Sequence, residues 1–194
     1  MTLRRLLALG SLCLASPVWA DGTSTTHVWF PSRPLTAVGA AATTFGEQQC
    51  HAWVPDLGIT GGTTVAWYIT TGFGVGKKCT VTVYTANGSA QIVTTGPQDC
   101  STSGTVVVTG LGPFAWTAGT KLWVCLCGTA GGSVLTTNTG PSLLLRDFRN
   151  ALSVPLDAAS ANDCTAGVAP ASTGALTAAS ARLPFYVLFA TGTP

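Results

Sequence analysis

The stretch CTVTVYTANGSAQIVTTG, residues 79–96, decides the fold because two strand-forming runs flank an Asn-Gly pair in it. In its first half an apolar residue alternates with Thr or Tyr, so Cys79 shares one apolar face with two valines. Asn87-Gly88 favours a type I′ turn, in which both central residues have positive φ. The sequence therefore predicts an antiparallel hairpin with Cys79 on its apolar side.

A second informative stretch is KLWVCLC, residues 121–127. Leu and Val occupy every second position, and the period of two places Trp123, Cys125 and Cys127 together on the opposite face. Two cysteines aligned along one strand cannot bond to each other without distortion. We therefore expect Cys125 and Cys127 to reach different segments.

Residues 1–20, MTLRRLLALGSLCLASPVWA, contain the three parts of a secretory signal peptide in order. Arg4 and Arg5 precede a short apolar run, and Val18 and Ala20 fit cleavage after Ala20. The run is too short to span a bilayer, and the alternative is a buried N-terminal helix. We expect a secreted, periplasmic or cell-surface protein of bacterial type, with no transmembrane span after signal removal.

Beyond this leader the chain has an even number of cysteines: Cys50, Cys79, Cys100, Cys125, Cys127 and Cys164. In an exported protein this predicts up to three disulfides. A Cys79–Cys100 bond fits the base of the hairpin. Cys50 and Cys164 then remain for the two cysteines of residues 121–127, in an order that the sequence does not assign.

The composition excludes several classes of function. The chain has 194 residues, of which 46% are apolar and 8% are charged. The chain has 9 Lys and Arg residues and 7 Asp and Glu residues. Two of the basic residues lie in the leader, so the rest of the chain has equal numbers of basic and acidic residues. A neutral chain lacks the basic footprint of a nucleic-acid partner. One Glu and three Lys against 31 Thr disfavour helices with exposed faces.

Runs of Thr, Val and aromatic residues separated by Gly, Pro, Asn and Asp predict many short strands. They cover residues 26–30, 48–54, 63–71, 79–85, 90–95, 105–109, 121–127, 133–137, 142–146 and 183–190. Because no amphipathic helical segments intervene, we expect residues 21–194 to form a single antiparallel β-sandwich domain.

The end of the chain contains two contrasting segments. Residues 151–181 are rich in Ala, Ser and Thr, which predicts a long surface excursion pinned by Cys164, or else a short helix over residues 175–181. The closing run LPFYVLFA, residues 183–190, is apolar on both faces and predicts a central, buried strand.

Residues 63–127 contain the segments TVAWYITTGFGV, CTVTVYTANGSAQIVTTG, SGTVVVTGL and FAWTAGTKLWVCLC. This pattern resembles jelly-roll-like β-sandwich modules of secreted bacterial proteins and of phage tail or fibre proteins. The resemblance implies a fold, a tendency toward surface display or assembly, and in some members sugar binding. The six cysteines depart from the phage modules and favour the secreted class.

No catalytic constellation stands out, so we expect a non-catalytic protein without cofactor or metal. His27 and His51 are the only histidines, no C-x-x-C occurs for zinc, and no G-x-S-x-G elbow is present. His51 follows Cys50 and is expected to be a partly exposed strand residue, with Cys50 unavailable as a nucleophile if it is disulfide-bonded.

Two further patterns bear on catalysis. Glu47 with Asp56 or Asp99 is the carboxylate pair that a secreted hydrolase, the disfavoured alternative, would need. The stretch GFGVGKK, residues 72–78, lacks the spacing of a phosphate-binding loop and predicts a turn between strands.

Carbohydrate binding is the better functional hypothesis, because sugars stack on exposed aromatic rings. Trp67 alternates in register with apolar residues and is assigned to the core, whereas Trp53 and Tyr84 are the candidates for exposed ligand contacts. The expected partner is a glycan or a protein surface. The alternative is an oligomer, a subunit of an extracellular or virion-like assembly, which low charge and a mean hydropathy of +0.42 suit.

Overall fold

The structure is a computed structural model that describes residues 27–30, 38–42, 47–128, 133–137, 156–164, 167–174, 177–178 and 185–192. Within these ranges every regular element is a β-strand, and all strand pairs are antiparallel. The predicted all-β, antiparallel class is confirmed. The predicted leader, residues 1–20, and the predicted strand of residues 142–146 lie outside the described residues.

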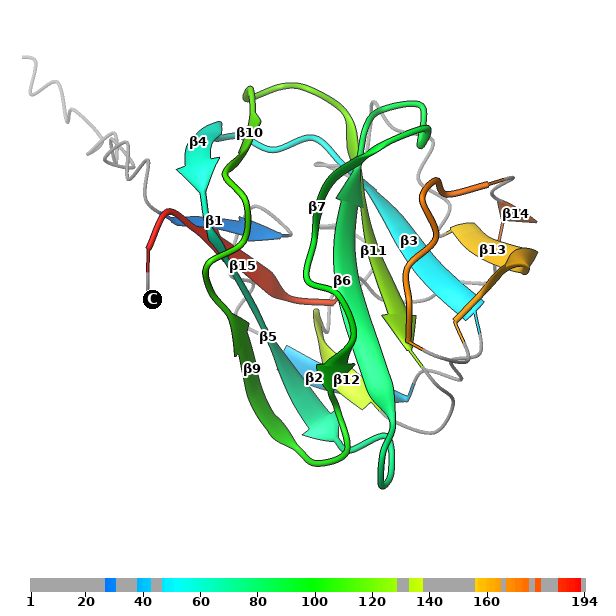
Figure 1. Cartoon of the computed structure of the whole chain (residues 1–194). Helices are drawn as coiled ribbons and strands as arrows, with labels where there is room; N and C mark the ends of the chain where they lie inside the picture. The colour runs from blue at the N-terminus through cyan, green and yellow to red at the C-terminus, as the bar shows by residue number, and fades with distance from the viewer. Residues whose placement is uncertain are drawn as a thin grey trace, which may run out of the picture.

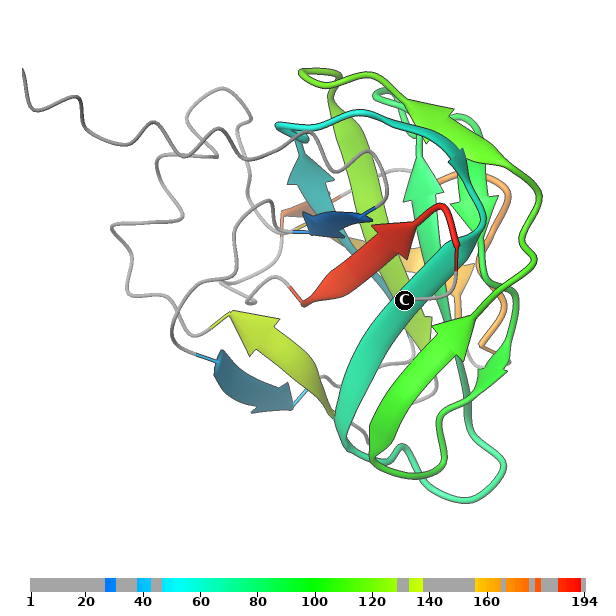
Figure 2. The same cartoon turned by 90° about the vertical axis from the view of Figure 1, so that its left-hand side faces the viewer.

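Two large sheets and one small sheet contain these strands (Figure 1, Figure 2). Sheet A has the order β1 (His27–Phe30), β15 (Val187–Ala190), β5 (Thr64–Thr71), β12 (Ser133–Thr137) and β2 (Val38–Ala42), with β9 (Gly104–Val108) also paired to β5. Sheet B has the order β14 (Thr177–Ala178), β13 (Leu156–Asp163), β3 (Glu47–Trp53), β11 (Leu122–Gly128), β6 (Lys78–Tyr84) and β7 (Gln91–Thr94), with β8 (Gln98–Asp99) also paired to β6. The small sheet pairs β10 (Phe114–Trp116) with β4 (Ile59–Gly62).

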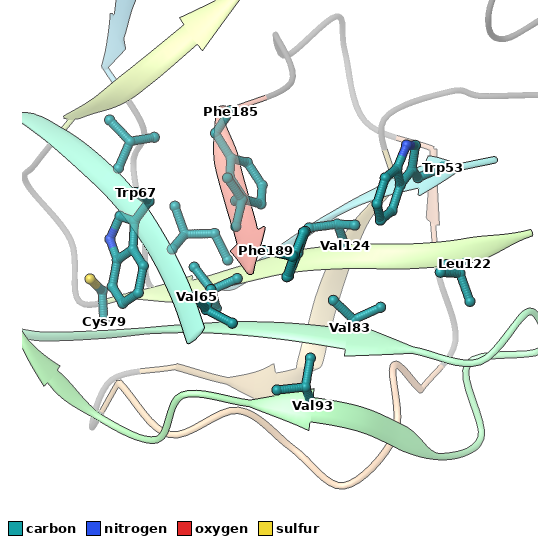
Figure 3. Packing of buried hydrophobic residues seen from close by; sticks show 14 of the residues in the cluster. Trp53, Val65, Trp67, Cys79, Val83, Val93, Leu122, Val124, Phe185 and Phe189 are labelled. Carbon is teal, nitrogen blue, oxygen red and sulfur yellow. The ribbon is translucent and has the colours of Figure 1, made fainter. Parts of the chain in front are cut away.

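The hydrophobic core lies between sheet A and sheet B, which both contribute side chains to it. Val65, Trp67 and Phe189 come from sheet A, while Val83 and Val124 come from sheet B (Figure 3). The chain crosses repeatedly from one sheet to the other, as in a jelly roll: β5 leads to β6, and β11 leads to β12. This is the sandwich that the sequence predicts, and Trp67 is a core residue as expected.

Strand β11 lies in the interior of sheet B, between β3 and β6, and is buried at every position. Leu122, Val124 and Leu126 belong to the core between the sheets. The residues between them, including Trp123 and Cys125, form a second buried cluster on the outer face of sheet B. The predicted alternation is confirmed, and it shows that sheet B is covered on both faces.

The last strand also matches its prediction. Strand β15 lies between β1 and β5 and is buried along its whole length. An apolar run without alternation is the pattern of a strand that is covered on both faces, so the closing segment of the chain belongs to the middle of sheet A.

Residues 151–181 are only partly as expected. The short helix considered for residues 175–181 is wrong over the described part, because Thr177–Ala178 is strand β14, paired with β13. Strand β13 in turn pairs with β3, with Leu156 opposite Cys50. An isolated helix of one or two turns is marginal in water, whereas pairing with β13 satisfies backbone groups of both β13 and β14.

The hairpin of β6 and β7 is confirmed, but its turn differs from the predicted one. Gly88 donates its N–H to Thr85 O at 2.8 Å, so Ala86 and Asn87 are the two central residues of the turn. Gly88 follows with a φ of 70°. A residue distant in sequence contacts the turn, because Thr173 donates its N–H to Gly88 O at 2.9 Å.

We expect Gly88→Ala to destabilise the protein strongly. A Cβ at Gly88 would lie 2.0 Å from Thr173 Oγ1, and the positive φ of Gly88 is itself strained for alanine. Steric overlap and backbone strain together should lower the free energy of unfolding by about 2–4 kcal/mol, measured by urea denaturation.

Gly96→Ala is the matched control for this substitution. Gly96 has a similar φ of 66°, and a Cβ there would meet nothing within 4 Å. Only the backbone term should then remain, about 1 kcal/mol. Equal losses for the two variants would contradict the proposed role of the Thr173 contact.

Candidate functional site

All six cysteines outside the leader form disulfides in the structure. The bonds are Cys50–Cys125, Cys79–Cys100 and Cys127–Cys164. The predicted bond at the base of the hairpin is confirmed, and so is the inference that the two cysteines of β11 reach different segments. Because all six sulfur atoms are bonded, none is available as a thiolate ligand for zinc or as a nucleophile.

The three bonds hold different layers of the molecule. Cys50 lies directly opposite Cys125 in the register of β3 and β11, with 4.0 Å between their Cα atoms, on the outer face of sheet B. Cys79 and Cys100 belong to the core between the sheets. Cys127 connects β11 to the segment that follows β13.

That segment, residues 164 and 167–174, covers part of the outer face of sheet B and is called the strap here (orange in Figure 1). The Cys127–Cys164 bond holds one end, and the hydrogen bond from Thr173 to Gly88 holds the other. Within the strap, Gly167 donates its N–H to Cys164 O at 2.7 Å. Cys164 therefore ties the strap to β11, whereas the long surface excursion expected over residues 151–181 stays a prediction.

Carbonyl groups of the strap accept hydrogen bonds from the side chains beneath it. Thr80 Oγ1 donates to Gly167 O. Tyr84 Oη and Gln91 Nε2 both donate to Pro170 O, each at 2.7 Å. Thr80, Tyr84 and Gln91 are therefore satisfied within the protein, and the part of sheet B that they occupy is an internal interface between sheet and strap.

The predicted exposure of Tyr84 is wrong, because its side chain is 0% exposed. The ring packs with Trp123 and with the Cys50–Cys125 bond, and Gln48 Nε2 donates to its hydroxyl at 2.7 Å. Burial raises the pKa of the Tyr84 phenol. The Thr-rich face of β6 suggested solvent contact, but the strap covers it, so Tyr84 cannot stack on a sugar in this structure.

The predicted exposure of Trp53 is also wrong, since its side chain is 4% exposed. Trp53 stacks on Phe189 of β15 with 5.7 Å between ring centroids and meets Trp116 of β10 edge-on at 5.4 Å. It therefore joins sheet B to sheet A and to the small sheet. The proline that follows in sequence suggested a strand end at the rim, but the ring points into the core.

His51 is buried as well, at 3% exposure, and not partly exposed as expected. It lies on the core face of β3, where its Nε2 is 3.1 Å from Gln49 Nε2 and its ring meets Phe185 edge-on at 5.6 Å. Gln49 Oε1 is buried and accepts no hydrogen bond from the part of the chain that the structure describes. The neighbouring Cys50 is disulfide-bonded, so this pair offers no thiolate–imidazole chemistry.

The carboxylates proposed for a hydrolase are not close together in the sheet. Asp56 lies beyond Trp53, the last residue of β3, at one end of sheet B. Asp99 of β8 pairs with Lys78, at the opposite end of the sheet. At the rise per residue of a strand, the two ends are about 20 Å apart. Glu47 lies at the same end as Asp99, but β11 and β6 separate β3 from β8 by about 14 Å. Glycosidase pairs are about 5–9.5 Å apart.

Asp99 instead has a local structural contact. Ser101 donates from its backbone N–H and from its hydroxyl to Asp99 Oδ1, at 3.0 and 2.5 Å. These hydrogen bonds lower the pKa of the Asp99 carboxyl. The same loop supports the turn of residues 72–78, because Gly76 donates its N–H to Ser101 Oγ at 3.1 Å. The predicted turn is confirmed, and Val75 projects from it with 98% exposure.

The clearest exposed surface belongs to sheet A. Strand β9 pairs with β5 on one side, and none of the described strands pairs with its other side (Figure 1, Figure 2). Val107 of β9 is 45% exposed, and Tyr68 of β5 is 42% exposed. Thr105, which lies opposite Tyr68, is exposed too. These residues together with the backbone of β9 are called the β9 edge.

The β9 edge combines backbone groups that pair with none of the described strands, apolar side chains, and no charged residue in the strand itself. Residues 100–120 contain no Asp, Glu, Lys or Arg. Among the described aromatic side chains, Tyr68 is the exposed one. Sequence analysis did not single out these residues, although the alternation in β5 already places Tyr68 on the face opposite Trp67. Chemically, the edge is able to accept an added strand.

No family model, curated protein or solved structure matches this chain. The resemblance to secreted and phage appendage modules stays a prediction from the residues. Three disulfides are compatible with an extracellular location. Within the described ranges, no helix has the length and apolar character that a membrane crossing requires.

We expect Tyr84→Phe to destabilise the protein by about 1–3 kcal/mol, because it leaves Pro170 O and the Gln48 amide with one partner fewer in a buried site. Urea denaturation measures the loss. Tyr68→Phe removes the same hydroxyl from an exposed ring and should change stability by less than about 0.5 kcal/mol. If Tyr84→Phe leaves the free energy of unfolding unchanged, the assigned hydrogen bonds are contradicted.

The raised pKa of Tyr84 predicts a loss of stability in alkali. The unfolded phenol ionises near its ordinary value of 10.0, before the buried one does. Above that pH the unfolded state binds fewer protons than the folded state, so stability falls as pH rises toward the folded pKa. Denaturation midpoints measured from neutral pH upward should fall more steeply for the wild type than for Tyr84→Phe. Parallel profiles would contradict a contribution of Tyr84.

Proposed function

We propose that the protein is an exported, non-catalytic interaction module that binds an extended polypeptide segment at the β9 edge. The segment adds to sheet A as a further antiparallel strand. The observation that carries this proposal is the exposed, uncharged edge formed by β9, with Val107 and Tyr68 beside it. Export is the inference from residues 1–20 and from the paired cysteines.

The rest of the molecule supports this proposal as a rigid scaffold. The disulfides join β3 to β11, the hairpin base to the following loop, and β11 to the strap. The strap covers part of the outer face of sheet B and accepts hydrogen bonds from Thr80, Tyr84 and Gln91, so these side chains are not available to a ligand. Binding surfaces are often held by a rigid scaffold of this kind.

The chemistry of the edge fits a strand better than a sugar. An added strand of five residues would form on the order of five backbone hydrogen bonds, each contributing about 0.5–1.5 kcal/mol net. Val107 and Tyr68 then offer apolar contacts to alternate side chains of the added strand. Trp53 and Tyr84, the contacts proposed for a glycan, are buried.

A library of random displayed peptides tests this proposal. Selection on the wild-type protein should enrich uncharged, β-branched peptides, and amide hydrogen exchange should show that they protect residues 104–108. Val107→Lys should weaken their binding about tenfold or more, because a lysine on an edge strand opposes pairing.

Val75→Lys is the control, since Val75 is exposed at 98% on a loop outside sheet A. It makes the same change of charge and should leave peptide binding unchanged. If no enriched peptide depends on Val107, or if the two lysine variants bind alike, the proposed function is wrong.

A further inference from the structure

We propose that the strand received by the β9 edge is β9 of a second copy of this chain. This inference rests on the proposed function and names its partner. Two copies related by a twofold axis would place their β9 strands side by side and antiparallel. Sheet A of one copy would then continue into sheet A of the other, which is the isologous arrangement of most dimers.

The residues of β9 suit a strand that pairs with β5 on one side and with a second copy of itself on the other. The strand reads Gly-Thr-Val-Val-Val, and its β-branched residues are strong strand formers. Val106 and Val108 pack against the core, whereas Thr105 and Val107 point outward and are exposed. In antiparallel pairing, directly opposite residues lie on the same face of the sheet. The inward valines of the two copies would therefore stay on the core face.

Charge also favours a second copy. A twofold axis brings a charged group that lies close to it near its own counterpart, so the centre of a surface that pairs with itself must avoid charge. Residues 100–120 contain no charged residue, whereas Lys77 and Lys78 contact Cys100 and Asp99, which precede β9 in the chain. The strand itself is therefore neutral, and no charge within it opposes pairing with its own copy.

We expect the register in which all five residues of β9 in one copy lie opposite all five in the other. The two Val106 residues then face each other at the centre, and Thr105 of each copy lies opposite Val107 of the other. The two Val107 residues are then diagonal neighbours, with about 7–8 Å between them. A strand pair of this length spans about 17 Å and buries less than about 1,000 Å², so association should be reversible and depend on concentration.

Sedimentation equilibrium on the full exported chain tests the inference. The test places a positive or a negative charge at Val107 and then mixes the two variants. Wild type should dimerise as its concentration rises. Val107→Lys alone and Val107→Glu alone should each raise the dissociation constant about tenfold or more, because like charges then meet across the axis. An equimolar mixture of the two variants should recover dimerisation, and Val75→Lys should behave as wild type.

The outcomes separate this inference from the function on which it rests. A wild type that stays monomeric at every concentration, or a mixture that associates no better than each variant alone, overturns the second copy as partner. If displayed peptides still bind at Val107 in that case, the proposed function stands and only the partner is wrong. If peptide binding fails as well, both are wrong.

Discussion

The position of β11 inside sheet B is the constraint on which the rest of the structure depends. Its period of two sends Leu and Val side chains into the core and sends Trp123, Cys125 and Cys127 to the outer face. Because the outer residues are apolar or sulfur-bearing, this face also has to be covered. The Cys127–Cys164 bond holds the strap that covers it. A sandwich with two sheets thus acquires a third layer, which the composition of β11 requires.

Covering the outer face of sheet B changes where a function can lie. The strap places its carbonyl groups over Thr80 and Tyr84, so polar side chains that suggest a ligand surface serve an internal interface instead. Trp53 is used in the same way on the core side, where it connects three sheets through ring contacts. Most of the described aromatic residues are buried and fix the layers of the protein, and two of its exposed apolar side chains, Tyr68 and Val107, lie at the edge of sheet A.

Sequence reasoning succeeded where local signals were strong. Strands β5, β6 and β11 follow from alternation, and the separate partners of Cys125 and Cys127 follow from the geometry of one strand. Strands β2, β4 and β13 were missed because their residues, VGAAA, ITGG and LDAASAND, have weak strand propensity. Their pairing depends on neighbouring strands with backbone groups to satisfy, which no local pattern reveals.

The burial of Tyr84 could not be predicted for a related reason. Its covering segment is distant in sequence, since Pro170 lies 86 residues further along the chain. The turn of the hairpin was misassigned as well, since its central residues are Ala86 and Asn87, and the contact of Thr173 with Gly88 was equally invisible to local patterns. Periodicity shows which side chains share a face, but it does not show whether a remote segment covers that face.

The edge strands β7 and β9 differ in how well they are protected from pairing with a strand of another chain. Strand β7 of sheet B shifts register against β6, its Gln91 is hydrogen-bonded to the strap, and Pro97 follows it. Bulges, prolines and covering segments are the devices that keep edge strands from pairing with other chains. Strand β9 has five residues without proline or charge, and it pairs with β5 without a register shift. Among the described strands, β7 therefore carries the features that oppose the addition of a further strand, and β9 carries none of them.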